Sequence, residues 1–357
     1  MVKLNQALDY SGKTIFVGMD VHLKKWNITL YNEQQYLRKF QQESNPQTLV
    51  NHLKKNYPGA HFKLAYEAGF CGFWIQRAFE HQGMECIVVN AADVPQTDKG
   101  IKRKNDVTDS FRIAESLKGG LLKPIFVPDP QTESDRTVIR YRHSLHKDLV
   151  RCKARIKSFL NHFGIKLPAE FENSKWTKAL LQWLKELKFE HPTMRLTLSR
   201  MIEQVEQLHQ KLLELSRDIR VMIRSERYCS DVKLLMTVPG IGVLTSISFL
   251  TEIGSIKRFS SFYKLNSFIG LCPTEFSSGE NEHNGSITPR HHKQLRRLLV
   301  EAAWTAIRLD PALNFAFGEY KKRMTAKRAI VRIARKLLNR IYFVLNKQQP
   351  YVTGVVE

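Results

Sequence analysis

The sequence predicts an α/β domain at the N-terminus, a helical middle region and a mostly α-helical C-terminal part. Up to residue 120, short β-type segments alternate with segments of helical periodicity. A proline-containing stretch at 122–135 then interrupts the pattern, because proline does not fit helix interiors or central strands. Beyond it, apolar residues recur at three- and four-residue steps. We therefore expect three domains, over residues 1–130, 131–228 and 229–357.

The first domain should contain eight elements. The segments read as strand, strand, strand, helix, strand, helix, strand and helix, over 14–21, 25–32, 36–43, 46–57, 61–68, 73–83, 85–90 and 106–120. Close turns separate the first three strands, and glycines stop the last two helices. This order, three strands joined by close turns and then two α/β units, resembles the strand order of the RNase H fold.

The middle region carries a long apolar seam. The steps between successive apolar positions are 3, 4, 3, 4, 3, 4 and 3 residues, at Leu198, Met201, Val205, Leu208, Leu212, Leu215, Ile219 and Met222. This heptad spacing is typical of a coiled coil. Two arrangements would bury it equally well: a helical hairpin within one chain, or a coil that joins several chains.

The C-terminal part begins with two apolar helical stretches around Pro239-Gly240-Ile241-Gly242, which resembles a helix–hairpin–helix element. Glycines allow close backbone approach, and the start of the next helix can bind a phosphate. A purely structural hairpin explains the motif equally well. A nucleotide-binding glycine loop does not, because no lysine follows in the required position and no strand precedes it.

The formal net charge of +22 indicates a polyanionic partner. The charge is concentrated: residues 290–347 contain 15 Lys and Arg against 3 acids, and residues 136–166 contain 9 against 1. A membrane surface is disfavoured, because the sequence has neither a long apolar run nor a signal peptide. We therefore expect a cytoplasmic, nucleoid-associated protein that binds nucleic acid. Five cysteines without a CxxC pair argue against a disulfide framework.

Four carboxylates stand at the ends of predicted elements. Asp20 ends the first strand, Glu67 ends the fourth, and Asp106 and Asp109 share one face at the start of the last helix. Alone, each is most simply a helix cap or an exposed acid. Together they predict a site for two divalent ions about 3.5–4 Å apart, of the kind that cleaves phosphodiesters. Oxygen ligands favour Mg²⁺, with Mn²⁺ possible.

Two further segments complete the expected site. Lys102, Arg103 and Lys104 directly precede the last two carboxylates and could bring phosphate to the metals; a basic loop is the alternative. Residues 270–288, "GLCPTEFSSGENEHNGSIT", have the composition of a solvent loop.

The chain resembles the DEDD transposases of bacterial insertion sequences, with an RNase H-type (RuvC-like) domain and a separate transposase domain. The resemblance rests on "VGMDVH", "YEAGFCG" and "KNDVTDSFRIA" for the four acids, then on "VPGIG", "IGLCPTEFSSG" and "LRRLLVEAAW". It covers nearly the whole chain, and the order and spacing make it specific.

The resemblance implies further roles. It makes Ser278 the nucleophile, and it implies a structured non-coding bridge RNA that pairs with donor and target DNA. The sequence departs from the family at Pro289 and His291, where Lys and Gly are usual. Arg290, Lys293, Arg296 and Arg297 could supply the phosphate contacts instead.

The hypothesis is a DNA recombinase that acts as a homo-oligomer, a dimer or a tetramer. Metal ions held by the four acids would activate Ser278, which would form a covalent link to DNA. The alternatives are a resolvase-like nuclease that uses water, and a non-catalytic nucleic-acid-binding scaffold.

Overall fold

The computed structural model describes residues 9–95, 106–172, 176–278 and 281–353. The chain divides into two compact units, Met1–Val127 and Pro128–Glu357.

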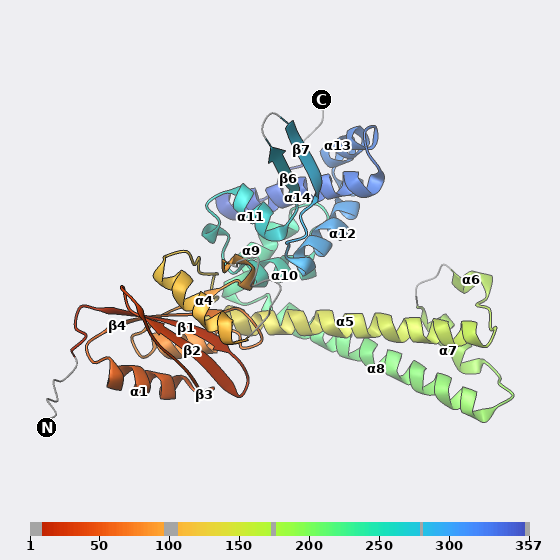
Figure 1. Cartoon of the computed structure of the whole chain (residues 1–357). Coiled ribbons are helices and arrows are strands. Elements are labelled where there is room, and N and C mark those ends of the chain that lie inside the picture. Colours follow the sequence, from red (N-terminus) through yellow and green to blue (C-terminus); the bar gives the residue numbers. More distant parts are fainter. Residues whose placement is uncertain (1–8, 96–105, 173–175, 279–280, 354–357) are drawn as a thin grey trace, which may run out of the picture. The chain divides into compact units, whose positions relative to one another are not determined.

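The first unit is built on a five-stranded mixed sheet (Figure 1). The order across the sheet is β3-β2-β1-β4-β5, with bounds Tyr36–Glu43, Lys25–Tyr31, Thr14–Val21, His61–Glu67 and Glu85–Val89. The first three strands are antiparallel, whereas β4 runs parallel to both β1 and β5. The predicted mixed α/β domain is confirmed, and its topology is consistent with an RNase H-like domain.

Helices cover both faces of this sheet. On one face, α1 (Pro46–Asn56) and α2 (Trp74–Glu80) pack against Ile15, Val17 and Met19 of β1. On the other face lies α4 (Asp106–Lys118), which follows a 3-10 turn at Ala91–Asp93 in the described part of the chain. Because side chains alternate along a strand, the even-numbered residues of β1 face α4.

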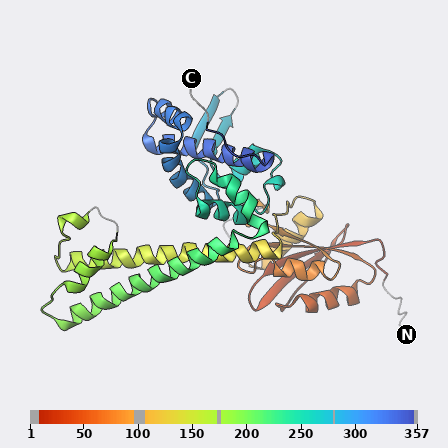
Figure 2. The same ribbon diagram turned by 180° about the vertical axis from the view of Figure 1, so that it is seen from behind.

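The second unit begins with a long helical hairpin, α5 (Pro130–His162) and α8 (Pro192–Met222), which lie side by side in Figures 1 and 2. Asp129 caps α5, because its side chain accepts a hydrogen bond from the Thr132 amide. The seam of α8 packs within the same chain, against a row of α5 side chains at Leu145, Leu149, Cys152, Ile156 and Leu160.

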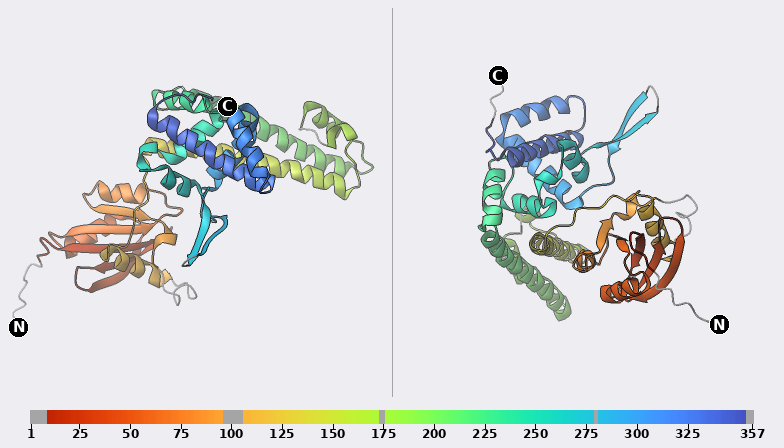
Figure 3. Two further views of the ribbon diagram at one scale, coloured as in Figure 1. Left: turned by 90° about the horizontal axis from the view of Figure 1, so that it is seen from above. Right: turned by 90° about the vertical axis from the view of Figure 1, so that its left-hand side faces the viewer.

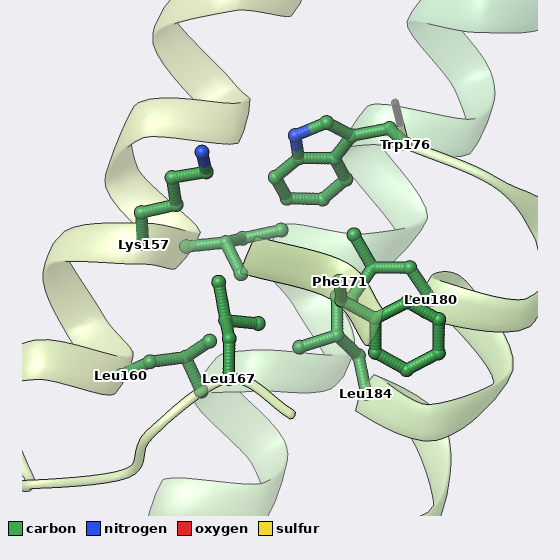
Figure 4. Close-up of a pocket in the computed structure, with 8 residues that line it drawn as sticks. Lys157, Leu160, Leu167, Phe171, Trp176, Leu180 and Leu184 are labelled. Carbon is green, nitrogen blue, oxygen red and sulfur yellow. The ribbon is translucent and has the colours of Figure 1, made fainter. Parts of the chain in front are cut away.

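The tip of the hairpin is closed by two short helices, α6 (Ala169–Glu172) and α7 (Lys178–Glu186). Figure 4 shows Phe171, Trp176 and Leu180 around a small apolar pocket that Leu160 of α5 also lines. These contacts give the end of a long hairpin its own apolar core.

The rest of the second unit is a helical bundle with one β-hairpin. Its helices are α9 (Glu226–Met236), α10 (Val243–Ile253), α11 (Phe262–Ile269), α12 (Lys293–Leu309), α13 (Pro311–Lys321) and α14 (Ala326–Lys347), with a 3-10 turn at Ile256–Arg258. Almost every residue in the second half of α10 is buried, and α14 buries a full apolar face.

The β-hairpin corrects one expectation. We expected a loop over 270–288, but β6 (Pro273–Ser278) and β7 (Asn281–Ile287) pair as antiparallel strands that project from the helices in both views of Figure 3. Ser, Asn and Glu have weak strand preference, so their composition pointed to a loop. Backbone pairing does not depend on side chains, and it can override that preference.

Gly240 has a structural explanation. It lies in the turn between α9 and α10 with φ of +83°, and a Cβ there would lie 2.5 Å from the Ala302 carbonyl oxygen of α12. The turn therefore needs glycine for close packing on α12. The helix–hairpin–helix interpretation stays a prediction.

No helix in the described ranges combines the length and apolar character that a bilayer crossing requires.

Candidate active site

Asp20 and Glu67 lie at one edge of the sheet. β1 and β4 run parallel, with Met19 opposite Tyr66, so Asp20 and Glu67 are the next residues along the two neighbouring strands. Met19 points to the buried face covered by α1 and α2, and Asp20 consequently lies on the α4 side.

A glycine lets α4 approach this edge. A Cβ at Gly18 would lie 2.2 Å from the Ser110 carbonyl oxygen and 2.3 Å from the Ala114 nitrogen, so the helix rests directly on the β1 backbone. Opposite Gly18 on β2, Thr29 Oγ1 lies 2.9 Å from Ser110 Oγ, in a buried hydrogen bond. These contacts fix the start of α4, and Asp109 with it, on the face that carries Asp20.

Arg112 connects the carboxylate of α4 to that of β4. Its Nη2 lies 3.0 Å from Asp109 Oδ1 and 4.0 Å from Glu67 Oε1. The Arg112 side chain is 19% exposed, and its buried Nε has no hydrogen-bond partner among the residues that the structure describes. A partly desolvated guanidinium thus offsets the repulsion between two acids from different elements.

Asp20 has polar partners of its own. His22 Nε2 lies 3.0 Å from Asp20 Oδ2, and Asn27 Nδ2 donates to the same oxygen at 3.3 Å. Asn27 stands opposite Asp20 in the β1–β2 register. Both contacts hold the carboxylate in one orientation.

Lys39 belongs to the same electrostatic cluster. It stands opposite Thr29 in the β2–β3 register and therefore on the α4 face. Burial lowers its pKa, while Asp20 and Asp109 oppose that shift. Lys39 is thus close enough to interact electrostatically with both carboxylates.

Sequence reasoning missed His22, Asn27, Lys39 and Arg112. Two of them left a local signal, because His22 is two residues from Asp20 and Arg112 is one helical turn from Asp109. The other two become neighbours only through strand register, which the sequence alone does not specify.

The remaining acid and its basic neighbours are less completely described. Asp106 is the first residue of α4, one turn before Asp109, and its side chain lies outside the described part. Lys102, Arg103 and Lys104 also lie outside the described residues.

The donor chemistry suits a hard divalent ion, because carboxylates from β1, β4 and α4 point to one edge. Within the described ranges, however, no three His, Cys, Asp or Glu side chains are grouped tightly enough to hold a metal. Arg112 instead occupies the position between Asp109 and Glu67.

Ser278 lies in the second unit. It is the last residue of β6 and pairs with Asn281 of β7. The predicted nucleophile therefore stands at the end of a strand of the β-hairpin.

The base of this hairpin is fixed by Arg296. Its Nη1 donates to the carbonyl oxygens of Thr288 at 2.7 Å and Gly270 at 3.2 Å. Gly270 also packs against His291, one of the two departures from the family pattern. A Cβ at residue 270 would be 2.2 Å from the Cβ of His291. The His291 side chain thus fits only because residue 270 is glycine. Its Nδ1 lies 2.6 Å from the carbonyl oxygen of Pro289, the other departure.

The other basic candidates lie at the start of α12. Arg290 and Lys293 are exposed, the latter as the first helical residue. Arg297 Nη2 lies 3.1 Å from His143 Nδ1 of α5.

Two models of known protein families match this chain. Residues 17–165, which include the sheet edge and α4, match a model of a DEDD transposase domain from IS110 elements, described as "Transposase". Residues 232–316, which include the β-hairpin, match the "Transposase IS116/IS110/IS902 family". The chain contains both domains of IS110-family transposases. The family resemblance inferred from the motifs is thereby confirmed.

Several curated relatives are similar in sequence to this chain. A putative transposase, y4qE, of Sinorhizobium fredii is 31% identical over 69% of this chain and 58% of its own length. The transposase for insertion sequence element IS1533 of Leptospira borgpetersenii is 26% identical over 95% of this chain and 97% of its own. A pilin gene-inverting protein of Moraxella bovis is 35% identical over 33% and 38%. The chain thus spans little more than half of the first relative but nearly all of the second.

Proposed function

We propose that the chain is an insertion-sequence transposase that cuts and rejoins DNA strands, with Ser278 as nucleophile and Asp20, Glu67, Asp106 and Asp109 as metal ligands. The observation that carries the proposal is the convergence of carboxylates from β1, β4 and α4 at one sheet edge, in a chain of net charge +22. Family membership supports the same assignment.

The four acids would hold Mg²⁺ or Mn²⁺. Such ions, when bound, stabilise the attacking and leaving oxygens of a phosphodiester. Arg112 competes for Asp109 and Glu67, so its guanidinium must leave at least one of them to the ions. His22 and Asn27 orient the Asp20 carboxylate in either case.

Ser278 would carry the covalent step. Its Oγ attacks the phosphorus, the bond to one DNA oxygen breaks, and that oxygen takes up a proton while the serine hydroxyl loses one. The product is a phosphoserine ester that keeps the phosphodiester energy for rejoining. A serine hydroxyl is weakly nucleophilic at neutral pH and needs such activation.

The name of one relative favours rejoining of the DNA strands over simple hydrolysis. The Moraxella protein is named for gene inversion, a rearrangement in which DNA ends are joined again. We propose the same outcome here, with donor and target DNA as substrates and a homo-oligomer, dimer or tetramer, as the acting form. The family resemblance supports a structured guide RNA as a further partner.

A denaturing gel with end-labelled DNA tests the nucleophile. Wild-type protein should give a slow protein–DNA band, Ser278→Ala should abolish it, and Ser277→Ala is the matched control that keeps it. Asp20→Asn should remove all cleavage. If Ser278→Ala still cuts DNA in a metal-dependent manner, the chain is a water-using nuclease. If wild type binds DNA but never cuts it, it is a scaffold.

The guide is tested separately, by sequencing the RNA that copurifies with the full chain expressed from its own element. A discrete RNA encoded beside the gene supports guidance, and its absence refutes that part of the proposal.

A further inference from the structure

Three helices of the second unit enclose a pocket of about 300 Å³ that is distinct from the carboxylate site. Each helix contributes one stripe: Arg142, His143 and His146 from α5, Thr245 from α10, and Gln294 and Arg297 from α12. Residues three and four apart share a helix face, so this convergence follows from their spacing. Ile139, Leu244 and Leu298 form the apolar part of the lining.

The pocket lining carries a net positive charge, because two arginines outnumber one acid. Arg142 donates through Nε to Ser216 Oγ at 3.2 Å, and no acidic side chain of the described residues forms an ion pair with it. Glu301 is the acid of the lining; it is 61% exposed and lies 3.8 Å from Arg297 Nε. Two guanidinium groups and two imidazoles thus face a single, solvated carboxylate.

The Arg142 side chain is held in place by its surroundings. Burial lowers its pKa, which reflects the cost of keeping this guanidinium away from water. The hydrogen bond to Ser216 uses only Nε, so the two terminal nitrogens keep donors for a ligand. A partly buried arginine with unused donors suits an anion site.

The pKa values of the two imidazoles are lowered by burial and by the neighbouring cations. Burial lowers the pKa of His143, and Arg297 and Lys147 lower it further. Burial likewise lowers the pKa of His146, followed by Arg142 and Arg297. Because Arg297 can only donate, His143 Nδ1 accepts its hydrogen bond, and Nε2 then carries the proton as a donor.

The size and donor set fit a tetrahedral oxyanion better than a planar metabolite. A phosphate accepts bidentate hydrogen bonds from arginine and further bonds from hydroxyl, amide and imidazole donors. The apolar part of the lining suits the sugar that adjoins a backbone phosphate.

We propose that this pocket binds a phosphodiester of the nucleic-acid backbone through Arg142 and Arg297, with His143 and His146 as further donors. It would anchor a DNA or RNA strand on the second unit. This inference rests on the proposed function, because it presumes a nucleic-acid partner.

The test measures the salt dependence of binding. Fluorescence anisotropy of the full chain with labelled duplex DNA, and with RNA of the same sequence, gives log K against log salt concentration. Each lost phosphate contact lowers the slope by about 1. The double variant Arg142→Gln/Arg297→Gln should lower it by about 1 to 2 and weaken binding at least tenfold, for whichever nucleic acid occupies the pocket.

A matched double variant controls for net charge. Arg151 and Arg200 also lie in the second unit, where they pair with Asp148 and Glu203. The variant Arg151→Gln/Arg200→Gln removes the same number of positive charges as the pocket variant. Its slope should stay within a few tenths of wild type. If the pocket variant, shown to be folded by its thermal midpoint, gives the same slope as this control for both DNA and RNA, the proposal is wrong.

A pH series supplies a readout that does not need the arginine variants. In the free protein the neighbouring cations disfavour protonation of His143 and His146, whereas a bound anion favours it. Wild-type affinity should therefore rise about three- to tenfold from about pH 7.5 to about pH 5.5. The charged groups facing the imidazoles are Arg142, Lys147 and Lys153 on α5, and Arg297 and Glu301 on α12. In His143→Gln/His146→Gln this rise should disappear; an unchanged rise contradicts the imidazole contacts.

Two outcomes separate this inference from the proposed function. In the first, wild-type protein binds nucleic acid with the expected dependence on the pocket arginines and yet forms no Ser278 adduct with DNA. That result refutes the proposed recombinase function and supports the proposed phosphodiester pocket. If calorimetry shows that inorganic phosphate binds wild type but not the arginine variant, while the nucleic-acid slopes are equal, the pocket binds free phosphate and the backbone assignment fails.

Discussion

Gly18 of β1 and Ser110 of α4 are in direct backbone contact: a Cβ at residue 18 would lie 2.2 Å from the Ser110 carbonyl oxygen. Gly18→Ala should therefore push α4 from the sheet and lower the free energy of unfolding by about 1–3 kcal/mol. Because Asp109 moves with α4, DNA cleavage should fall as well. Thermal or urea denaturation measures the first effect.

The control for this prediction is Gly69→Ala, in the same unit. The nearest atom to a Cβ there is the Glu67 carbonyl oxygen at 4.0 Å, which is ordinary contact. It should change stability by no more than about 0.5 kcal/mol. Equal stability of the two variants would contradict the close packing of α4.

Arg112 should compete with divalent ions for its carboxylates. Arg112→Gln removes the charge between Asp109 and Glu67, so it should destabilise the protein by about 1–3 kcal/mol in metal-free buffer. Mg²⁺ should then raise the thermal midpoint of the variant more than that of wild type, since a ligand that binds the native state stabilises it.

Lys63→Gln is the comparison for Arg112, because it breaks an exposed ion pair with Glu85 in the same sheet. Its response to Mg²⁺ should equal that of wild type. A Mg²⁺ response of Arg112→Gln no larger than this would show that Arg112 and metal do not share a site.

Glu252 should make stability depend on acid pH. It is 4% exposed and accepts hydrogen bonds from Arg140 at 2.7 Å and 2.8 Å, with His292 Nε2 at 3.2 Å. Burial alone would raise its pKa, but the hydrogen bonds from His292 and Arg140 outweigh burial and lower the pKa from 4.5 to about 2. A lowered folded-state pKa means that this stabilisation is present above about 4.5 and is lost as the pH falls toward 2.

Glu252→Gln should accordingly destabilise the protein at neutral pH by about 3–5 kcal/mol, because it removes the buried charged partner of Arg140 and of Arg136, whose side chain is 11% exposed. The difference from wild type should shrink as the pH is lowered from about 4.5 toward 2 in urea titrations. The exposed Glu226→Gln serves as control, with no such pH dependence. A pH-independent difference for Glu252→Gln would contradict the ionised network.

Two adjacent leucines of α8 should behave differently. Leu212, at 7% exposure, faces α5, whereas Leu213 is 45% exposed. Leu212→Ala should cost about 2–5 kcal/mol, and Leu213→Ala no more than about 0.5.

Light scattering during size-exclusion chromatography then tests what the seam does. If it serves the hairpin of one chain, Leu212→Ala should lower stability without changing the mass of the particle. A loss of mass in Leu212→Ala, with no such loss in Leu213→Ala, would show that the seam joins chains.

Sequence reasoning succeeded where local pattern controls structure. The strands that carry Asp20 and Glu67 near their ends, and the helix that starts at Asp106, follow from periodicity and turn residues alone. It failed at β6 and β7, because polar composition suggested a loop and the stabilising backbone pairing leaves little trace in composition.

The sequence by itself determined the order of elements in the first unit, the heptad seam, the concentration of positive charge and the family. Only the tertiary structure decided which faces meet: α4 rests on Gly18, Arg112 lies between Asp109 and Glu67, and the seam of α8 packs on α5. The reason is physical. Periodicity depends on neighbours along the chain, whereas these contacts depend on strand register and on close packing between residues far apart in sequence.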